Sequence, residues 1–207
     1  MKRRGDIRRI FGARIQTIVG LIICAWLVIA SFSFIPPSAK EQIRWMNSTQ
    51  LSADDFRKKN PGRKVKVKTG RRTYRMLEGY IHSGIAFSYV AQGSKVEYEV
   101  YAFMLPDESW LADRNNLGTL EHEQAHFNIS EMCARALREK LSHIDEPAVA
   151  KLEYQRMMRE LARTQAGFDQ DHDDETGVTE KWQKKIDESL NKKAAFAATI
   201  VIPIKKH

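Results

Sequence analysis

The sequence predicts an α+β fold in which an antiparallel β-hairpin is followed by three helices. Between residues 85 and 105, apolar and polar side chains alternate on both sides of a Gln-Gly-Ser turn, as in two strands that each bury one face. From Leu117 onward, apolar residues recur at helical spacing. A hydrophobic content of 43% and a charged content of 29% are typical of a soluble globular domain, which excludes a disordered chain or a multi-span membrane protein.

The first 39 residues are typical of an export signal. Six basic residues precede an uncharged run from Ile15 to Ala39, which is the layout of a signal with a positive cytoplasmic end. The stretch from Ile15 to Ile35 is long enough to span a bilayer, and no clear small-x-small cleavage site follows it. A cleaved signal peptide and a retained anchor both fit. We therefore expect the rest of the chain to be periplasmic or secreted, either free or held at the cytoplasmic membrane by residues 15–35.

The charge of the chain does not indicate a nucleic-acid partner. The net charge is +8, but residues 1–39 supply +5 of it, from six basic residues and Asp6. The one concentrated basic patch of the exported part runs from Arg63 to Arg75, where lysines alternate with valines as on a strand with one solvated face. Contact of this patch with anionic lipid or an acidic partner is the alternative. Outside the signal only Cys133 remains, so no disulfide can form within the exported part.

The elements of the predicted domain follow one another from residue 40 to residue 196. After the Pro36-Pro37 linker, Ser52 can cap a short helical turn that ends before Asn60-Pro61-Gly62. The hairpin pairs Ile85–Ala91 with Lys95–Leu105.

Three helices complete the predicted domain. The first helix covers Leu117 to about Ser142, and the second covers Glu146–Thr164, with Pro147 in its first turn. An acidic loop, residues 168–177, then precedes a third helix from Thr179 to about Phe196. The tail, residues 197–207, either adds an edge strand or trails away.

The first helix contains HEQAH, a pattern that predicts a zinc site. His122 and His126 lie four apart, so both imidazoles can reach one ion from the same face of the helix. Glu123 is the next residue round the helix, where it can take a proton from a water that attacks a carbonyl group. Three fixed residues also occur together by chance, but this pattern lies in a helix that follows a β-hairpin in an exported chain. We predict zinc bound by His122 and His126, with Glu123 as the catalytic base.

A third ligand has to come from another element. Cys133 is seven residues beyond His126, about 10 Å along a helix, and is too distant to share the ion. The longer motif with a further histidine is absent, because Met132 occupies that position. We predict His172, because histidine is the commonest partner of a site that already holds two; Asp169, Asp171 and then Glu160 follow as alternatives. The other acidic candidates are Glu153, Asp173, Asp174 and Glu175.

Many residues beyond HEQAH agree with one known pattern. They are Val100-Tyr101-Ala102-Phe103, Ser109-Trp110, Leu120, His122, Glu123, His126, Phe127, Ile129, Glu131, Ala134 and Arg135. On these residues the chain resembles a family of secreted bacterial proteins that contain a domain of unknown function and are regarded as zinc-dependent proteases. The resemblance runs from Ile43 to about Leu190. It implies a zincin-like fold and a bound zinc, but no substrate.

The chain departs from the family pattern near the third ligand. The family tends towards an aromatic-Asp pair followed by Thr, His and Gly. Here Phe168-Asp169, His172 and Gly177 appear at a shorter spacing, and His172 does not adjoin the glycine.

Together these features predict an exported zinc metallopeptidase that hydrolyses a protein or peptide substrate. The alternative is a module at the cell envelope without catalysis, which either binds zinc or interacts with partners while tethered to the membrane. The sequence leaves the oligomeric state open.

Overall fold

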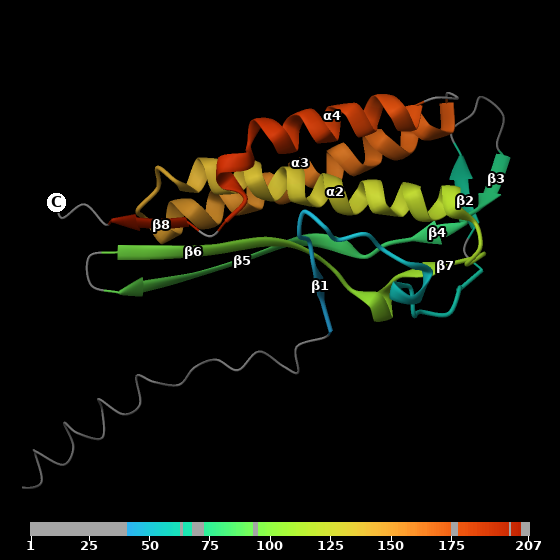
Figure 1. Ribbon diagram of the computed structural model, residues 1–207, viewed down its shortest axis with the longest axis horizontal. Coiled ribbons are helices and arrows are strands. Elements are labelled where there is room, and N and C mark those ends of the chain that lie inside the picture. The colour runs from blue at the N-terminus through green and yellow to red at the C-terminus, as the bar shows by residue number, and fades with distance from the viewer. Residues whose placement is uncertain are drawn as a thin grey trace, which may run out of the picture. The chain divides into compact units, whose positions relative to one another are not determined.

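The computed structural model describes residues 41–62, 64–67, 73–92, 95–174, 178–198 and 200–203. They belong to one compact unit, Lys40–His207. The unit is an α+β domain in which the helices lie on one side of a small antiparallel sheet (Figure 1), as the sequence predicts for the fold class. The predicted signal or anchor, residues 1–39, lies outside the described residues. Within the described part, no helix has the length and apolarity that a membrane crossing requires.

The predicted hairpin forms the centre of the sheet. Strand β5 (Ser83–Gln92) pairs antiparallel with β6 (Lys95–Met104), with Ile85 opposite Ala102. Successive side chains of a strand point to opposite faces, and every second residue of β6 is buried against the helices. These residues are Val96, Tyr98, Val100, Ala102 and Met104. Apolar and polar residues therefore alternate in the sequence because helices cover one face of the sheet.

Two short strands share the other edge of β6. Strand β1 (Ile43–Arg44) pairs with the end of β6, and β8 (Ile200–Pro203) pairs with its beginning. The tail beyond residue 197 thus contributes an edge strand, which the sequence left open. Two further ladders join β2 (Lys64–Val67) to β3 (Thr73–Met76), and β4 (Gly79–Tyr80) to β7 (Trp110–Leu111). A strand in the basic segment is therefore confirmed for residues 64–67.

Short 3₁₀ turns lead into and out of the sheet. Turn η1 (Ala53–Asp55) follows Ser52, whose backbone N–H and hydroxyl both donate to the Asp55 carboxylate, at 2.7 and 2.9 Å. Turn η2 (Pro106–Glu108) connects β6 to β7. The capped turn predicted at Ser52 is therefore present.

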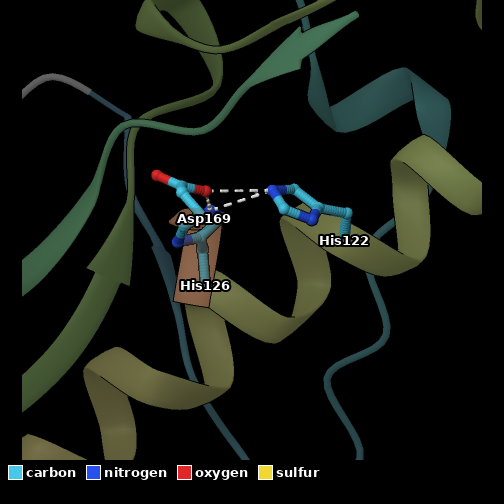
Figure 2. Close-up of side chains that lie close together, drawn as sticks. All are labelled: His122, His126 and Asp169. Carbon is cyan, nitrogen blue, oxygen red and sulfur yellow. Dashed lines mark hydrogen bonds and ion pairs between the residues drawn. The ribbon is translucent and has the colours of Figure 1, made fainter. Parts of the chain in front are cut away.

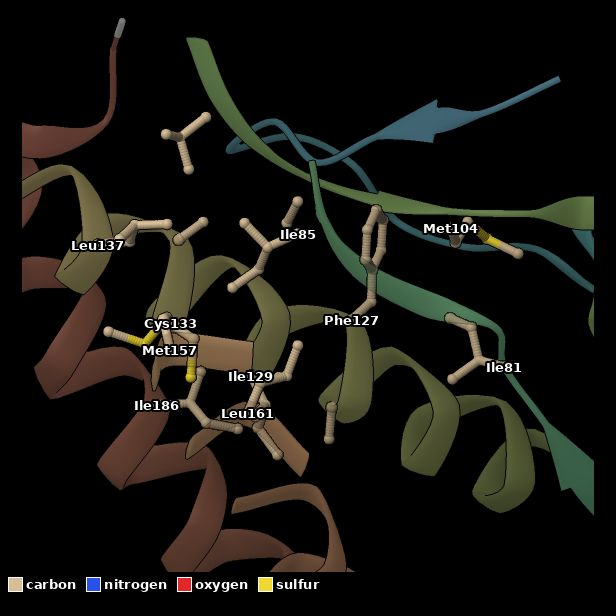
Figure 3. Close-up of a cluster of buried hydrophobic side chains, with 14 of the residues drawn as sticks. Ile81, Ile85, Met104, Phe127, Ile129, Cys133, Leu137, Met157, Leu161 and Ile186 are labelled. Atoms are coloured by element: carbon tan, nitrogen blue, oxygen red, sulfur yellow. The ribbon is translucent and has the colours of Figure 1, made fainter. Parts of the chain in front are cut away.

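Helix α2 (Leu117–Leu141) runs through the middle of the domain. Its first turn is capped by Asn116, whose side chain accepts a hydrogen bond from the Thr119 N–H at 3.1 Å. Phe127 packs toward β5 and β6, while α3 (Pro147–Asp174) and α4 (Val178–Lys192) contribute Met157, Leu161 and Ile186 to the same core (Figure 3). Because α2 contacts the sheet and both other helices, side chains on most of its circumference are buried.

Helix α3 is longer than the sequence predicts. It spans Pro147–Asp174, so the residues expected to form an acidic loop after Thr164 are helical up to Asp174. The prediction was wrong because these residues have partners in the fold: Phe168 is fully buried, and the carboxylates of Asp169 and Asp171 accept hydrogen bonds. Helix α4 (Val178–Lys192) and turn η3 (Ala194–Phe196) follow, close to the predicted third helix.

A buried ionic cluster fixes the second half of α2. Glu131 accepts hydrogen bonds from Arg135 and Arg138, and all three side chains are almost fully buried. The arginines also donate to backbone carbonyls of other elements: Arg138 to Val100 in β6, and Arg135 to Leu190 in α4. Glu131, Arg135 and Arg138 therefore connect α2 to the sheet and to α4.

Candidate metal centre

Three side chains from two helices bring donor atoms to one point. His126 Nε2 lies 2.8 Å from Asp169 Oδ1, and His122 Nε2 lies 3.2 Å from the same oxygen. The two Nε2 atoms are 3.2 Å apart. Figure 2 shows the histidines projecting from α2 toward Asp169, which comes from α3. Among the described residues, these three form a group whose ligand atoms are close enough to share a metal ion.

The spacing of the donor atoms agrees with a small cation. Zinc binds imidazole nitrogen and carboxylate oxygen at about 2.0 to 2.2 Å, and tetrahedral angles then place neighbouring donors about 3.3 Å apart. The observed distances of 2.8 to 3.2 Å are slightly shorter. An ion of this size therefore fits after the three side chains move apart by a few tenths of an ångström. Two histidines and a carboxylate also suit iron(II), so the donor set does not by itself identify the metal.

The structure brings together two predicted ligands and one of the proposed alternatives. His122 and His126 meet at the site as their spacing predicts, and the third donor beside them is Asp169. His172, the first choice from the sequence, lies on the same helix three residues further on, but its side chain is outside the described residues.

The other described carboxylates that the sequence offered as ligands have different partners. Asp171 accepts a hydrogen bond from Trp182. Glu160 lies 3.9 Å from Arg163, and Glu153 pairs with Lys140 and Arg156. None of these three carboxylates belongs to the triad.

Glu123, the predicted base, lies on α2 next to His122 and is buried. Only 4% of the residue is exposed. Burial raises the pKa of Glu123 to about 7; His122 opposes this, the charge of Asp169 adds to it, and a hydrogen bond from the backbone of Ile81 lowers it. A carboxyl group with this pKa exchanges a proton readily near neutral pH, which is the property that a general base requires.

Strand β4 approaches Glu123 closely at a glycine. A Cβ atom on Gly79 would lie 2.7 Å from Glu123 Oε1 and 2.8 Å from Thr119 Cγ2, distances shorter than atoms can tolerate. A side chain at position 79 would therefore push the Glu123 carboxylate or the Thr119 side chain aside. The sequence reasoning missed Gly79, although a single glycine inside a strand often indicates close approach of another group.

Asp169 is held in its anionic form. Its partial burial raises its pKa, but hydrogen bonds from His122 and His126 outweigh this effect and keep the pKa well below the usual range of an aspartate. Because the side chain is 55% exposed, solvent can reach the triad. A permanent negative charge next to two imidazoles is the charge arrangement that a divalent cation prefers.

Residues around His122 and His126 restrict the movement of these two histidines. The Phe168 ring stacks on His122 at a centroid distance of 4.7 Å and meets His126 edge-on at 5.0 Å. One turn further along α2, the buried Ser130 hydroxyl donates to the His126 carbonyl at 3.2 Å, and Gln165 of α3 donates to the same hydroxyl at 3.3 Å. Helices α2 and α3 are therefore joined both at the donor atoms and one turn away.

Comparisons with protein-family models, with curated proteins and with solved structures gave no match to this chain. The chemistry of the site therefore rests on its own geometry, and the family resemblance stays a prediction.

Proposed function

We propose that the protein is an exported zinc-dependent metallopeptidase of the zincin-like type. The observation that carries the proposal is the arrangement on α2, where His122 and His126 converge with Asp169 and where the residue between them, Glu123, is a buried carboxyl group with a pKa near neutrality. Two histidines with one carboxylate are a known ligand set of catalytic zinc in peptidases. An HExxH helix that follows an antiparallel hairpin supports the zincin-like assignment.

Each residue has a defined part in the proposed reaction. His122, His126 and Asp169 would hold the ion through Nε2, Nε2 and Oδ1. A zinc ion bound there would polarise the scissile carbonyl and would lower the pKa of water to about 7. Glu123 accepts a proton from the attacking water and then donates it to the leaving amine, so the carboxyl group ends the cycle ionised as it began. Gly79 leaves the space in which the Glu123 carboxylate lies.

The proposed location and partners come from the sequence. Residues 1–39 would direct export and would either be removed or remain as an anchor through residues 15–35. The domain would then face the periplasm or the exterior, where a protein or peptide serves as substrate. No nucleic-acid partner is proposed.

Zinc content and proteolysis of the full-length chain, purified in mild detergent, test the proposal. We expect about one zinc per chain, lost in His122→Ala and Asp169→Ala, and cleavage of an unfolded protein substrate that chelators abolish. Comparison of Asp169→Ala with His172→Ala decides which residue is the third ligand, because only the loss of a ligand removes the zinc.

The Glu123→Gln variant separates an enzyme from a binding module. We expect it to keep zinc but to lose activity by about 100-fold or more, the usual contribution of a general base. Glu121→Gln, an exposed neighbour on the same helix, is the matched control. If the wild type binds zinc but shows no activity that depends on Glu123, a non-catalytic zinc module at the cell envelope replaces the peptidase. If it binds no metal, the proposal is refuted.

A further inference from the structure

The end of α3 that carries Asp169 lies between two other helices. Trp182 of α4 donates a hydrogen bond from Nε1 to Asp171 Oδ2 at 2.9 Å. Its ring also meets Phe168 edge-on, with centroids 5.5 Å apart. Phe168 in turn stacks on His122. An unbroken series of contacts thus runs from α4 through the end of α3 to the proposed metal ligands.

The two aspartates of this segment are engaged on different sides of the helix. Residues two apart on an α-helix point about 200° from each other. Asp169 can therefore reach the histidines of α2 while Asp171 reaches Trp182 of α4. The Asp171 contact thus ties one side of the helix end to α4, while Asp169 faces α2 on the other side.

Asp169 needs such support because its own surroundings leave it room to move. Its side chain is 55% exposed, so close packing does not hold the carboxylate in place. By contrast, Phe168 and Trp182 are 0% and 6% exposed. The fixed residues are therefore the neighbours of Asp169, and Asp169 takes its position from them.

We propose that Trp182 is a positioning residue for the metal centre, acting through Asp171 and Phe168 on Asp169. This inference rests on the proposed metal site. Residues that orient metal ligands without touching the ion commonly contribute about 10- to 100-fold to metal affinity. The coupling is reciprocal, so a bound metal also makes the docking of α4 on α3 more stable.

The test measures zinc affinity of the full-length protein by competition with a chromophoric chelator. We expect Trp182→Phe, which keeps an aromatic ring but lacks the N–H donor, to bind zinc about 10-fold more weakly or worse. Asp171→Ala should weaken binding similarly. Asp171→Asn keeps an oxygen that accepts from Trp182 and should stay within about 3-fold of the wild type, and the double variant Trp182→Phe with Asp171→Ala should be no weaker than either single one.

Two further readouts separate positioning from general destabilisation. The absorption spectrum of the cobalt-substituted protein reports ligand geometry and should change in Trp182→Phe but not in Asp171→Asn. Hydrogen exchange in α4 should slow when zinc is added to the wild type and should slow less in Trp182→Phe.

The inference would be overturned if Trp182→Phe and Asp171→Ala both bound zinc as tightly as the wild type and showed an unchanged cobalt spectrum. That result would leave the proposed metal centre intact. If Trp182→Phe does not fold, the zinc affinities of Asp171→Ala and Asp171→Asn are compared instead. Equal affinities of these two variants would overturn the inference. A wild-type protein without zinc affinity would refute the metal centre and the positioning role together.

Discussion

Burial of Glu123 makes the stability of the metal-free domain depend on pH in a defined direction. Burial raises the pKa of this carboxyl group from 4.5 to about 7. Between these two pH values the folded domain keeps a proton that the unfolded chain has released. The contribution to stability is therefore fully present below pH 4.5 and is lost as the pH rises through 7. The free energy of unfolding should fall across this window.

The size of this effect follows from the same difference in pKa. One pKa unit corresponds to about 1.4 kcal/mol, so a rise of about 2.5 gives at most roughly 3 to 4 kcal/mol, of which about 3 falls between pH 4.5 and 8. Asp169 affects stability in the opposite direction, because folding lowers its pKa. Its contribution to the free energy of unfolding is present at neutral pH and is lost as the pH falls below the ordinary range of an aspartate. The two carboxyl groups therefore affect separate parts of the pH profile.

Urea denaturation of the compact unit from Lys40 onward, in the presence of a chelator, measures this effect. The free energy of unfolding of the wild type and of Glu123→Gln would be compared at intervals between pH 4.5 and 8. We expect the wild type to lose up to about 3 kcal/mol relative to Glu123→Gln over this range, because glutamine cannot ionise. Glu121→Gln, which removes an exposed carboxylate nearby, should follow the wild type. Parallel profiles for the wild type and Glu123→Gln would refute the assignment of a buried, proton-holding Glu123.

Three further predictions concern other parts of the domain. Gly79→Ala places a Cβ 2.7 Å from Glu123 Oε1 and should reduce the proposed peptidase activity by about 10- to 100-fold with zinc retained. Gly84→Ala, whose Cβ would have its nearest contact at 3.4 Å, is the control, and equal activities of the two variants would contradict the argument. Glu131→Gln leaves Arg135 and Arg138 buried without a carboxylate and should cost about 3 kcal/mol in urea denaturation. The control is Glu97→Gln at an exposed position, which should cost less than about 0.5 kcal/mol. A similar loss of stability in the two variants would argue against a stabilising role of the ionic cluster. Asp169→Asn should weaken zinc binding by more than about 100-fold in a chelator competition, whereas Glu160→Gln should not change it.

Local patterns predicted most of the fold because they depend on neighbours in the sequence. The alternation between residues 85 and 105 gave the hairpin, and the spacing of apolar residues after Leu117 gave α2. The end of α3 was not predictable in this way. Its acidic residues look like a solvated loop until Phe168 is seen in the core and Asp171 against Trp182.

The candidate site likewise contains some residues that local spacing predicts and others whose positions depend on packing. His122, Glu123 and His126 are fixed by helical spacing alone, so the sequence placed them together. Asp169 comes from a helix whose rotation depends on packing against α2 and α4. The sequence ranked it behind His172, whose side chain lies outside the described residues. Gly79 depends on the distance between a strand and a helix, which no pattern within either segment encodes.

The separation of the ligands along the chain has a consequence for when metal can be acquired. Asp169 follows His122 by 47 residues, so the complete set of donors exists only after α3 has packed on α2. If the chain crosses a membrane unfolded, it carries at most the two histidines of one helix in proximity. Metal loading would then follow folding at the destination, and the proteolytic activity proposed here would not develop inside the cell that makes the protein.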